Sequence, residues 1–176
     1  MKRNPLIRLL TKSLIGAVVV PSEVLAADPQ GVWLTEKGDA AVAIEPCGDR
    51  LCGRIVWLKD ATDESGRSRR DGHNADPAMR DRPICGLVVM EDLKSSGPDS
   101  WDDGIIYNPL DGKFYSGDMT LRSNNTLKVR AYLGMPFFGQ SQIWTRAERS
   151  AAGLVKYNCR YIRPPRRAVE VGPPEQ

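Results

Sequence analysis

The strongest constraint on the fold is the stretch from Trp101 to Arg146, where short apolar–polar alternations are separated by turn signals. In one of its segments every second residue from Leu127 to Leu133 is apolar, and the residues between are polar or amphipathic. The pairs Asp111-Gly112 and Asn124-Asn125 separate such segments, and these residue types tolerate positive φ in hairpin turns. Alternation with a period of two is typical of antiparallel strands with one buried face. The stretch therefore predicts four consecutive strands.

Four further segments upstream have strand character. They are residues 31–33, 39–45, 53–58 and 84–93. With them the chain has eight expected strands, few helices and mostly sequential hairpins. We expect an all-β fold, an eight-stranded antiparallel up-and-down barrel whose interior is filled by side chains or holds one small ligand. A two-sheet sandwich is the alternative, and periodicity alone does not separate the two.

Residues 1–26 have the composition of a secretory signal peptide. Basic residues stand at the front, an apolar core runs from Leu14 to Val20, and small residues precede a cleavage site after Ala26. The apolar run is shorter than the roughly 20 residues that span a bilayer. We therefore expect an exported protein, periplasmic or secreted, with no transmembrane segment in its mature chain.

The charge of the mature chain gives no support for nucleic-acid binding. Without the signal peptide 21 basic and 21 acidic residues remain, so the sequence pI of 8.7 reflects the targeting segment. We expect residues 27–147 to form the barrel domain and residues 148–176 a basic, proline-rich tail. The tail is either solvated or contacts an anionic partner in the cell envelope.

One long polar connection, residues 59–83, interrupts the expected hairpins; long loops of this kind are usually functional or disordered. Asp76 before Pro77 predicts the N-cap of a short helical turn. Asp71, Asn74 and Asp76 also offer oxygen ligands for Ca²⁺, but the glycine and the distal glutamate of an EF-hand loop are absent. We expect a capped, solvated lid, no metal and no cofactor.

The four cysteines of an exported chain are expected to form disulfides. Four cysteines allow three pairings. We favour Cys47 with Cys52, because the residues between them have the composition of a tight turn, and Cys85 with Cys159, which ties the tail to the barrel. The alternatives are metal binding and a catalytic redox role for the Cys47/Cys52 pair.

The sequence contains no recognisable catalytic constellation. His73 is the single histidine, and it lies in the charged connection, where we expect it to be solvated. Paired carboxylates for glycoside hydrolysis would have to come from acidic residues distant in sequence. We therefore expect a protein that is not an enzyme.

Several motifs, in order, resemble the DUF2147 family of uncharacterised exported bacterial proteins. They include Gly31-Val-Trp33, Leu51-Cys52-Gly53-Arg-Ile-Val-Trp57, Asn74-Ala-Asp76-Pro-Ala-Met-Arg80-Asp-Arg82-Pro83, Trp101-Asp-Asp-Gly-Ile-Ile-Tyr107 and Trp144-Thr-Arg146. The resemblance covers residues 31–146 and implies a lipocalin-like barrel, without an established activity. Cys85 stands where the family commonly has an apolar residue, which fits an additional disulfide to Cys159.

A wider resemblance to lipocalins concerns how one end of the barrel is closed. Lipocalins begin with Gly-x-Trp on the first strand and carry a late arginine that packs over this tryptophan. Gly31, Trp33 and Arg146 are in corresponding places. The resemblance implies a cation–π contact that closes this end and leaves the other end as the mouth.

The leading functional hypothesis is that the barrel binds a small hydrophobic ligand. The expected walls are the apolar faces of the strands, with Tyr115 as a polar group; the residues are Ile55, Trp57, Val88, Met90, Tyr115, Met119, Val129 and Ala131. The structural alternative is that all of them simply fill the core, and a β-bulge would exchange some for their neighbours. A further hypothesis is an envelope protein that contacts a macromolecule through Pro136-Phe137-Phe138 and the tail; a hydrolytic enzyme ranks below both.

Overall fold

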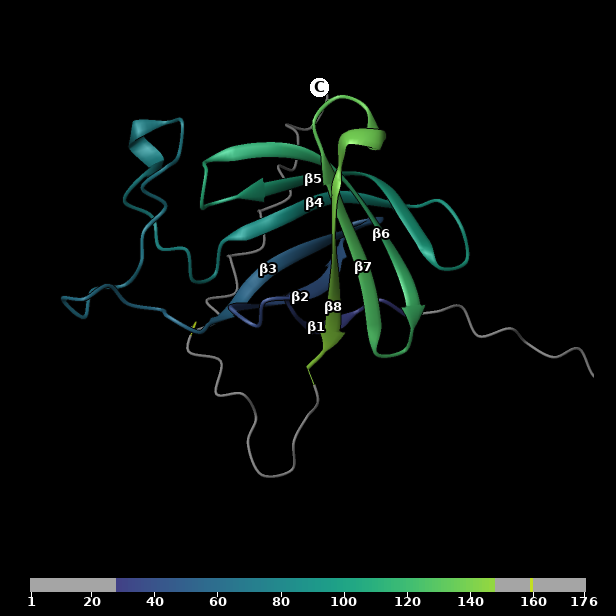
Figure 1. The fold of residues 1–176 in the computed structure, drawn as a ribbon, viewed down its shortest axis with the longest axis horizontal. Helices are drawn as coiled ribbons and strands as arrows, with labels where there is room; N and C mark the ends of the chain where they lie inside the picture. The colour runs from purple at the N-terminus through teal and green to yellow at the C-terminus, as the bar shows by residue number, and fades with distance from the viewer. Residues whose placement is uncertain (1–27, 148–158, 160–176) are drawn as a thin grey trace, which may run out of the picture.

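The structure, a computed structural model, describes residues 28–147 and Cys159. Eight antiparallel strands form a closed barrel in which each strand pairs with the next and β1 pairs with β8 (Figure 1). The strands are β1 (Gly31–Leu34), β2 (Ala40–Cys47), β3 (Arg50–Leu58), β4 (Val88–Ser95), β5 (Ser100–Asn108), β6 (Lys113–Ser123), β7 (Thr126–Tyr132) and β8 (Gln140–Arg146). The prediction of an eight-stranded up-and-down barrel is confirmed, and the sandwich alternative is wrong.

The alternation that predicted the strands sets which side chains face the interior. Met119 pairs with Val129 and Leu121 with Leu127 across β6 and β7, and all four side chains are buried. The intervening residues of these strands face outward because successive side chains of a strand point to opposite faces. The expected signal peptide, residues 1–26, and tail, residues 148–176, lie outside the described residues apart from Cys159.

A β-bulge between β2 and β3 changes the inward set. Val42 pairs with Ile55, but Ala41 pairs with Trp57, so Val56 is an extra residue on β3. An extra residue exchanges the two faces of the strand beyond it. Trp57 therefore lies on the outer face, and the expectation that it faces the interior is wrong.

A second irregularity has the same effect on β4. Gly53 pairs with Met90 while the next residue, Arg54, pairs with Val88, which leaves Val89 as the extra residue. Val88 faces outward beside Arg54, and Val89 is buried inside. The expected inward position of Val88 is wrong for the same physical reason as that of Trp57.

The fourth strand also begins later than the alternation predicted. Residues 84–87 form a turn in which the Leu87 N–H donates to the carbonyl of Ile84 and Gly86 has a φ of 83°. This turn remains attached to β3, since the Gly86 N–H donates to Ile55 and the Ile55 N–H donates to Leu87. The regular strand starts only at Val88.

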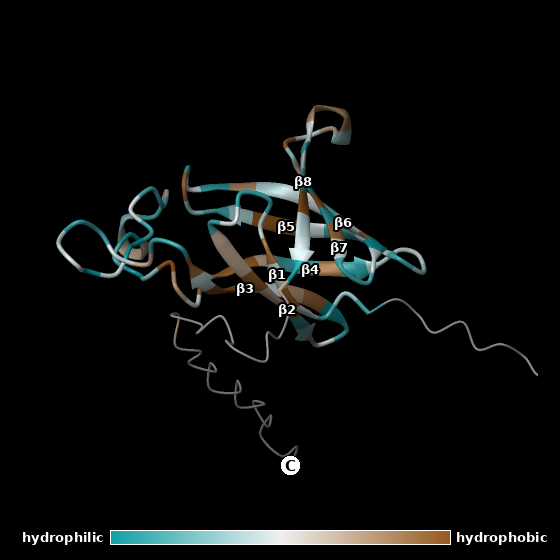
Figure 2. Cartoon of the chain, turned by 60° about the horizontal axis from the view of Figure 1, so that its bottom comes forward, coloured by the Kyte–Doolittle hydropathy of each residue, from teal (hydrophilic) through white to brown (hydrophobic). Residues whose placement is uncertain are grey.

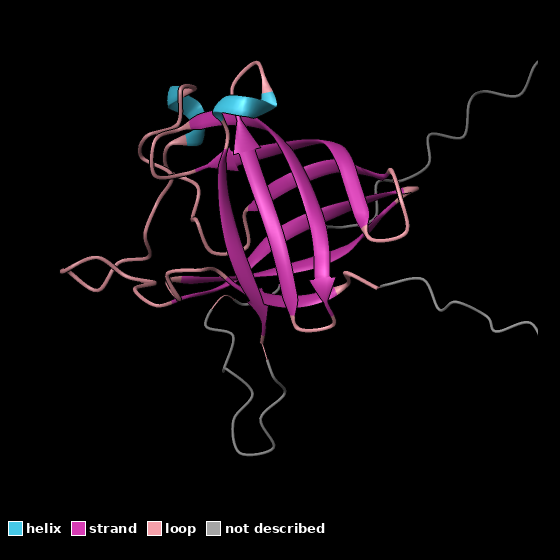
Figure 3. Ribbon diagram, turned by 45° about the vertical axis from the view of Figure 1, so that its right-hand side comes forward, coloured by secondary structure: helices cyan, strands magenta, loops and turns pink. Residues whose placement is uncertain are grey.

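The two ends of the barrel differ. The segments that join β1 to β2, β3 to β4, β5 to β6 and β7 to β8 lie at one end, together with the short 3₁₀ helices η1 (Pro77–Met79) and η2 (Pro136–Phe138) (Figure 3). The opposite half of the barrel is filled by large buried side chains: Trp33, Leu93, Trp101, Met119, Leu121 and Leu127. Met119 is thus part of a packed floor.

Both favoured disulfides are present. Cys47 and Cys52, with Cα atoms 5.8 Å apart, join β2 to β3 across their hairpin. Cys85, just before β4, bonds to Cys159, with Cα atoms 4.9 Å apart. Among the residues that the structure describes, no helix has the length and apolar character needed to cross a membrane.

Candidate functional site

The closed end of the barrel is formed by Trp33 and Arg146, which are cross-strand partners on β1 and β8. Trp33 is fully buried, and the Arg146 guanidinium carbon lies 4.2 Å from the centre of its ring. Arg146 also donates hydrogen bonds to the backbone carbonyls of Asp28, Gln30 and Asn124. The expected cation–π contact is present.

Gly31 makes this contact possible. A Cβ at this position would lie 2.6 Å from Nη1 of Arg146, and the φ of 129° is itself unfavourable for a residue with a side chain. The guanidinium therefore crosses the backbone of β1 at a point where only glycine leaves room. This end of the barrel is closed by the Arg146 guanidinium, which is hydrogen-bonded to backbone carbonyls and covers the Trp33 ring.

Above the packed floor the barrel is hollow, with a cavity of about 960 Å³ that opens between the loops of the other end. Ligand cavities in proteins typically measure about 300–1,000 Å³. The strand side chains that form most of its wall are apolar. They are Val42, Ile55, Val89, Met90, Ile106, Val129, Ala131 and Trp144.

Five of the eight residues that the sequence assigned to the ligand site line this cavity. They are Ile55, Met90, Tyr115, Val129 and Ala131. Trp57 and Val88 face outward, and Met119 lies below in the floor. The structure thus brings residues of β3, β4, β6 and β7 together around one cavity, as the alternation predicted.

The sequence reasoning missed the contribution of β8. Its inward residues Gln140, Gln142 and Trp144 line the cavity, and the indole N–H of Trp144 donates to Oε1 of Gln142 at 2.8 Å. Gln140 and Gln142 precede Trp144 at every second position, so the period of two could have placed them on its face. Because glutamine is polar, they do not form the apolar alternation that marks a buried face. They place amide groups on an otherwise apolar wall.

Charged residues surround the mouth, and several of them already have partners. The Tyr115 hydroxyl donates to Oδ2 of Asp111 at 2.5 Å, and the Thr35 hydroxyl donates to Asp39 at 2.6 Å. Burial alone would raise the pKa of Asp111, but the hydrogen bonds from Tyr115 and the Lys113 N–H outweigh it and lower the pKa. Tyr115, the expected polar group of the site, is thus engaged at the rim.

The long connection between β3 and β4 is attached to the barrel by a buried polar network. Asp71 is fully buried and accepts hydrogen bonds from the Tyr107 hydroxyl at 2.6 Å, the Asn74 amide at 2.8 Å and Nε of Arg82 at 2.8 Å. Asn74 also donates to the Tyr107 hydroxyl. The expectation of a solvated connection holds for most of its residues, which are exposed, but it is wrong for Asp71 and Asn74, which are buried.

This network also argues against a cation at Asp71. Both carboxylate oxygens already accept hydrogen bonds, one of them from a guanidinium that also lies 5.4 Å from the Tyr107 ring centre. Burial alone would raise the pKa of Asp71, but the bonds from Tyr107, Asn74 and Arg82 lower it overall. Asp71 is therefore an anion that holds the loop in place.

Two local features help the loop to dock. Asp76 caps η1 as predicted, since its carboxylate accepts from the Ala78 N–H at 2.9 Å. Gly112, with a φ of 69°, passes so close to the loop that a Cβ would overlap the carbonyl of His73. The His73 side chain itself is exposed.

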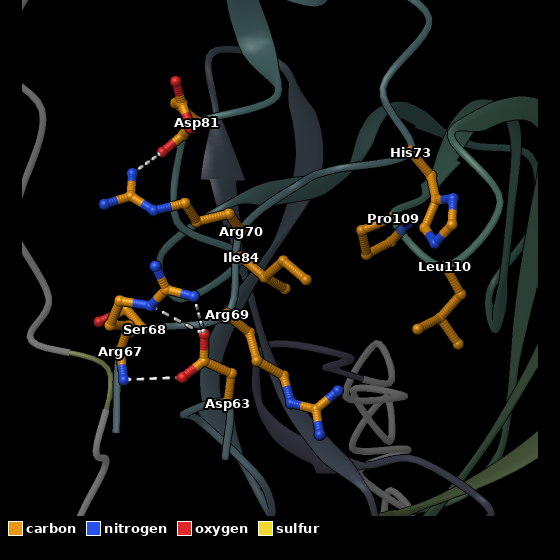
Figure 4. A pocket seen from close by; sticks show the side chains of 10 residues that line it. All are labelled: Asp63, Arg67, Ser68, Arg69, Arg70, His73, Asp81, Ile84, Pro109 and Leu110. Atoms are coloured by element: carbon orange, nitrogen blue, oxygen red, sulfur yellow. Dashed lines mark hydrogen bonds and ion pairs between the residues drawn. The ribbon is translucent and has the colours of Figure 1, made fainter. Parts of the chain in front are cut away.

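A smaller pocket of about 370 Å³ lies beside the mouth, between the β3–β4 connection and the β5–β6 turn (Figure 4). Its lining includes Arg67, Arg69, Arg70 and His73. Arg67 forms an ion pair with Asp63 at 3.1 Å, and Arg70 donates to the carbonyl oxygen of Asp81. Within the described part of the chain, no group of three or more ligating side chains is placed to hold a metal.

The rim of the mouth also carries exposed apolar side chains. Phe137 and Phe138 of η2 are 91% and 80% exposed, and Leu133, Met135 and Leu110 are also largely exposed. Figure 2 shows the β7–β8 loop as a hydrophobic projection at the top of the view. Leu110, Leu133 and Phe138 are at the same time part of the cavity lining.

Comparison with models of protein families shows which family the chain belongs to. A model described as "Uncharacterized protein conserved in bacteria (DUF2147)" matches residues 31–146. The chain belongs to the DUF2147 family. The match spans the whole barrel, from Gly31 to the Arg146 that covers Trp33, so the resemblance inferred from the ordered motifs is confirmed.

A solved structure supports the lipocalin-like fold of this DUF2147 member. It is described as "Protein HP1028 from the human pathogen Helicobacter pylori belongs to the lipocalin family". The TM-score is 0.63 at 23% sequence identity, and the alignment covers 70% of this chain and 85% of that protein. No curated protein matches the sequence. The likeness establishes the fold alone.

Proposed function

We propose that this protein is an exported binding protein that holds a small, largely apolar molecule in the hollow half of its barrel. The observation that carries the proposal is the cavity of about 960 Å³, closed below by a packed floor and open above. Transfer of apolar surface from water onto such walls is favourable by about 25 cal/mol per Å². The two disulfides support an oxidising, extracytoplasmic location.

The polar groups of the wall indicate that the ligand is amphipathic. Gln140 and Gln142 present amides toward the cavity from β8, and charged residues gather only at the mouth. A few hydrogen-bonding groups on an apolar wall are what orient ligands in such sites. A molecule with an apolar body and a polar end directed outward matches this distribution.

Filling the cavity should abolish binding without unfolding the barrel. Ala131→Trp places a large side chain in the hollow half, and overpacking typically costs about 1–3 kcal/mol. Lys128→Trp, on the outer face of the same strand, is the matched control. Native mass spectrometry of protein from the bacterial envelope should show a co-purified small molecule for the wild type and the control, and none for Ala131→Trp. An apo mass for all three, with no response to tetradecanoic acid or retinol, contradicts the proposal.

A second candidate function is docking of the mouth on an envelope protein, and the exposed aromatic loop favours it. Two adjacent phenylalanines with exposures of 91% and 80% are unusual on a free surface. Benzoylphenylalanine at position 137 should form a crosslink to one protein of defined mass in intact bacteria. The same residue in place of Ile143, an exposed side chain on the outer wall, should not. Equal crosslinking from both positions contradicts this function.

A further inference from the structure

We propose that Arg69 and the smaller pocket beside the mouth bind the anionic head group, a carboxylate or phosphate, of the molecule whose apolar part occupies the barrel. The inference rests on the proposed function and specifies the chemistry of its ligand. It also gives a role to the basic cluster of the β3–β4 connection, which the barrel cavity alone does not explain.

The first argument is that the two spaces adjoin each other. Arg69, Ile84, Pro109 and Leu110 line both the cavity of about 960 Å³ and the pocket of about 370 Å³. A ligand can therefore extend from the barrel into the pocket along a shared wall. Arg69 is the cation on that wall, with apolar side chains around it.

The second argument is that Arg69, among the arginines of the smaller pocket, has a guanidinium that is available to bind a ligand. Arg67 is neutralised by Asp63, and Arg70 donates to a backbone carbonyl of Asp81. Among the described residues Arg69 has no hydrogen-bond or ion-pair partner for its side chain. Figure 4 shows its guanidinium extending away from the Arg67–Asp63 pair.

The third argument concerns the carboxylates at this end of the molecule. The smaller pocket is lined by three arginines, Arg67, Arg69 and Arg70, and by two carboxylates, Asp63 and Asp81. The carboxylates of Asp39, Asp60 and Asp111 line the barrel cavity but not the smaller pocket. The excess of basic over acidic side chains within the smaller pocket favours an anion over a cation.

The chemistry of the guanidinium selects the head group. Its planar N–H fork pairs with two oxygens of a carboxylate or a phosphate at once, and such charge-assisted bonds are stronger than neutral ones. The buried side chain of Ile84 forms an apolar wall beside this site, and a less polar surrounding strengthens the attraction. An uncharged hydroxyl head group would gain little from the same site.

The test compares ligands with one tail and different head groups. Tetradecanoic acid, tetradecyl phosphate and 1-tetradecanol are titrated against the full mature protein, with Trp144 on the cavity wall as the fluorescent reporter. We expect at least one anion to bind about tenfold more tightly than the alcohol, and this preference to shrink as salt is raised. Arg69→Gln should remove the preference and leave alcohol binding unchanged. Arg122→Gln, at an exposed arginine of β6 that lines neither space, is the matched control and should keep it.

The outcomes separate the two proposals. Equal affinity of the wild type for acid, phosphate and alcohol overturns the head-group inference and leaves the barrel ligand standing. A loss in Arg69→Gln that is equal for anion and alcohol also overturns it, because the residue then only shapes the mouth. Failure of all three probes to bind overturns the proposed function and the inference with it. Which anion binds more tightly tells a carboxylate from a phosphate source.

Discussion

Asp71→Ala is expected to lower the free energy of unfolding by about 3–5 kcal/mol, because it removes the fully buried carboxylate of an ion pair and leaves three hydrogen-bond donors without their acceptor. The Tyr107 hydroxyl, the Asn74 amide and Nε of Arg82 all donate to this one carboxylate, whose side chain is fully buried. Urea denaturation followed by tryptophan fluorescence measures the change. Limited proteolysis should show new cleavage within residues 59–83 at the same time.

Asp76→Ala is the matched control, since it removes an aspartate from the same loop. The Asp76 carboxylate accepts one hydrogen bond from the Ala78 N–H in an exposed position, and loss of such a cap costs about 1 kcal/mol. A change for Asp71→Ala no larger than for Asp76→Ala would show that the network does not hold the connection to the barrel.

The same carboxylate predicts a pH dependence. The pKa of Asp71 is lower in the folded chain than its value of 3.8 in an unfolded one. Its ionised form is therefore favoured by folding, so its contribution is complete above pH 3.8 and is lost as the pH falls through the folded-state pKa. Asp71→Asn should be less stable than the wild type at pH 6, and the gap should narrow toward pH 3. A gap that is constant with pH contradicts the assignment of an ionised Asp71.

The strand order was predictable because one face of each strand had to be buried. The alternation around Leu127 and Met119 identified β6 and β7 with their inward faces, and the closed barrel follows when sequential strands pair. The bulges at Val56 and Val89 were not predictable from period alone. Each adds one residue where both neighbours are apolar, so nothing in the composition marks the point where the faces exchange.

The docking of the β3–β4 connection, residues 59–83, was not predictable for a different reason. Asp71 and Asn74 are polar residues in a polar stretch, which is ordinarily solvated. Their burial depends on Tyr107, 36 positions beyond Asp71 on β5, and on the arginine at position 82. The smaller pocket around Arg69 is likewise made by tertiary placement of the loop against the β5–β6 turn. The spacing of residues along the sequence does not reveal such contacts.

Trp33→Ala is expected to cost about 3–5 kcal/mol, the usual loss when a fully buried aromatic side chain is truncated in a core. Trp33 is fully buried, and its indole N–H donates to the Pro29 carbonyl at 2.8 Å. Truncation also removes the surface under Arg146, a cation–π contact worth about 0.5–2 kcal/mol. The change is measured by urea denaturation monitored by far-ultraviolet circular dichroism.

Trp57→Ala supplies the control with the same change of side chain. The bulge at Val56 places Trp57 on the outer face of β3, where it is only half-buried, so the loss should be about half as large or less. Arg146→Met tests the charge separately, because methionine keeps an apolar side chain over the ring but loses the three backbone hydrogen bonds; we expect a cost of about 1–3 kcal/mol. Equal costs for Trp33→Ala and Trp57→Ala would contradict the placement of Trp33 as the closed end. Because the ligand cavity lies on the far side of the packed floor, Arg146→Met should leave the binding of tetradecanoic acid unchanged.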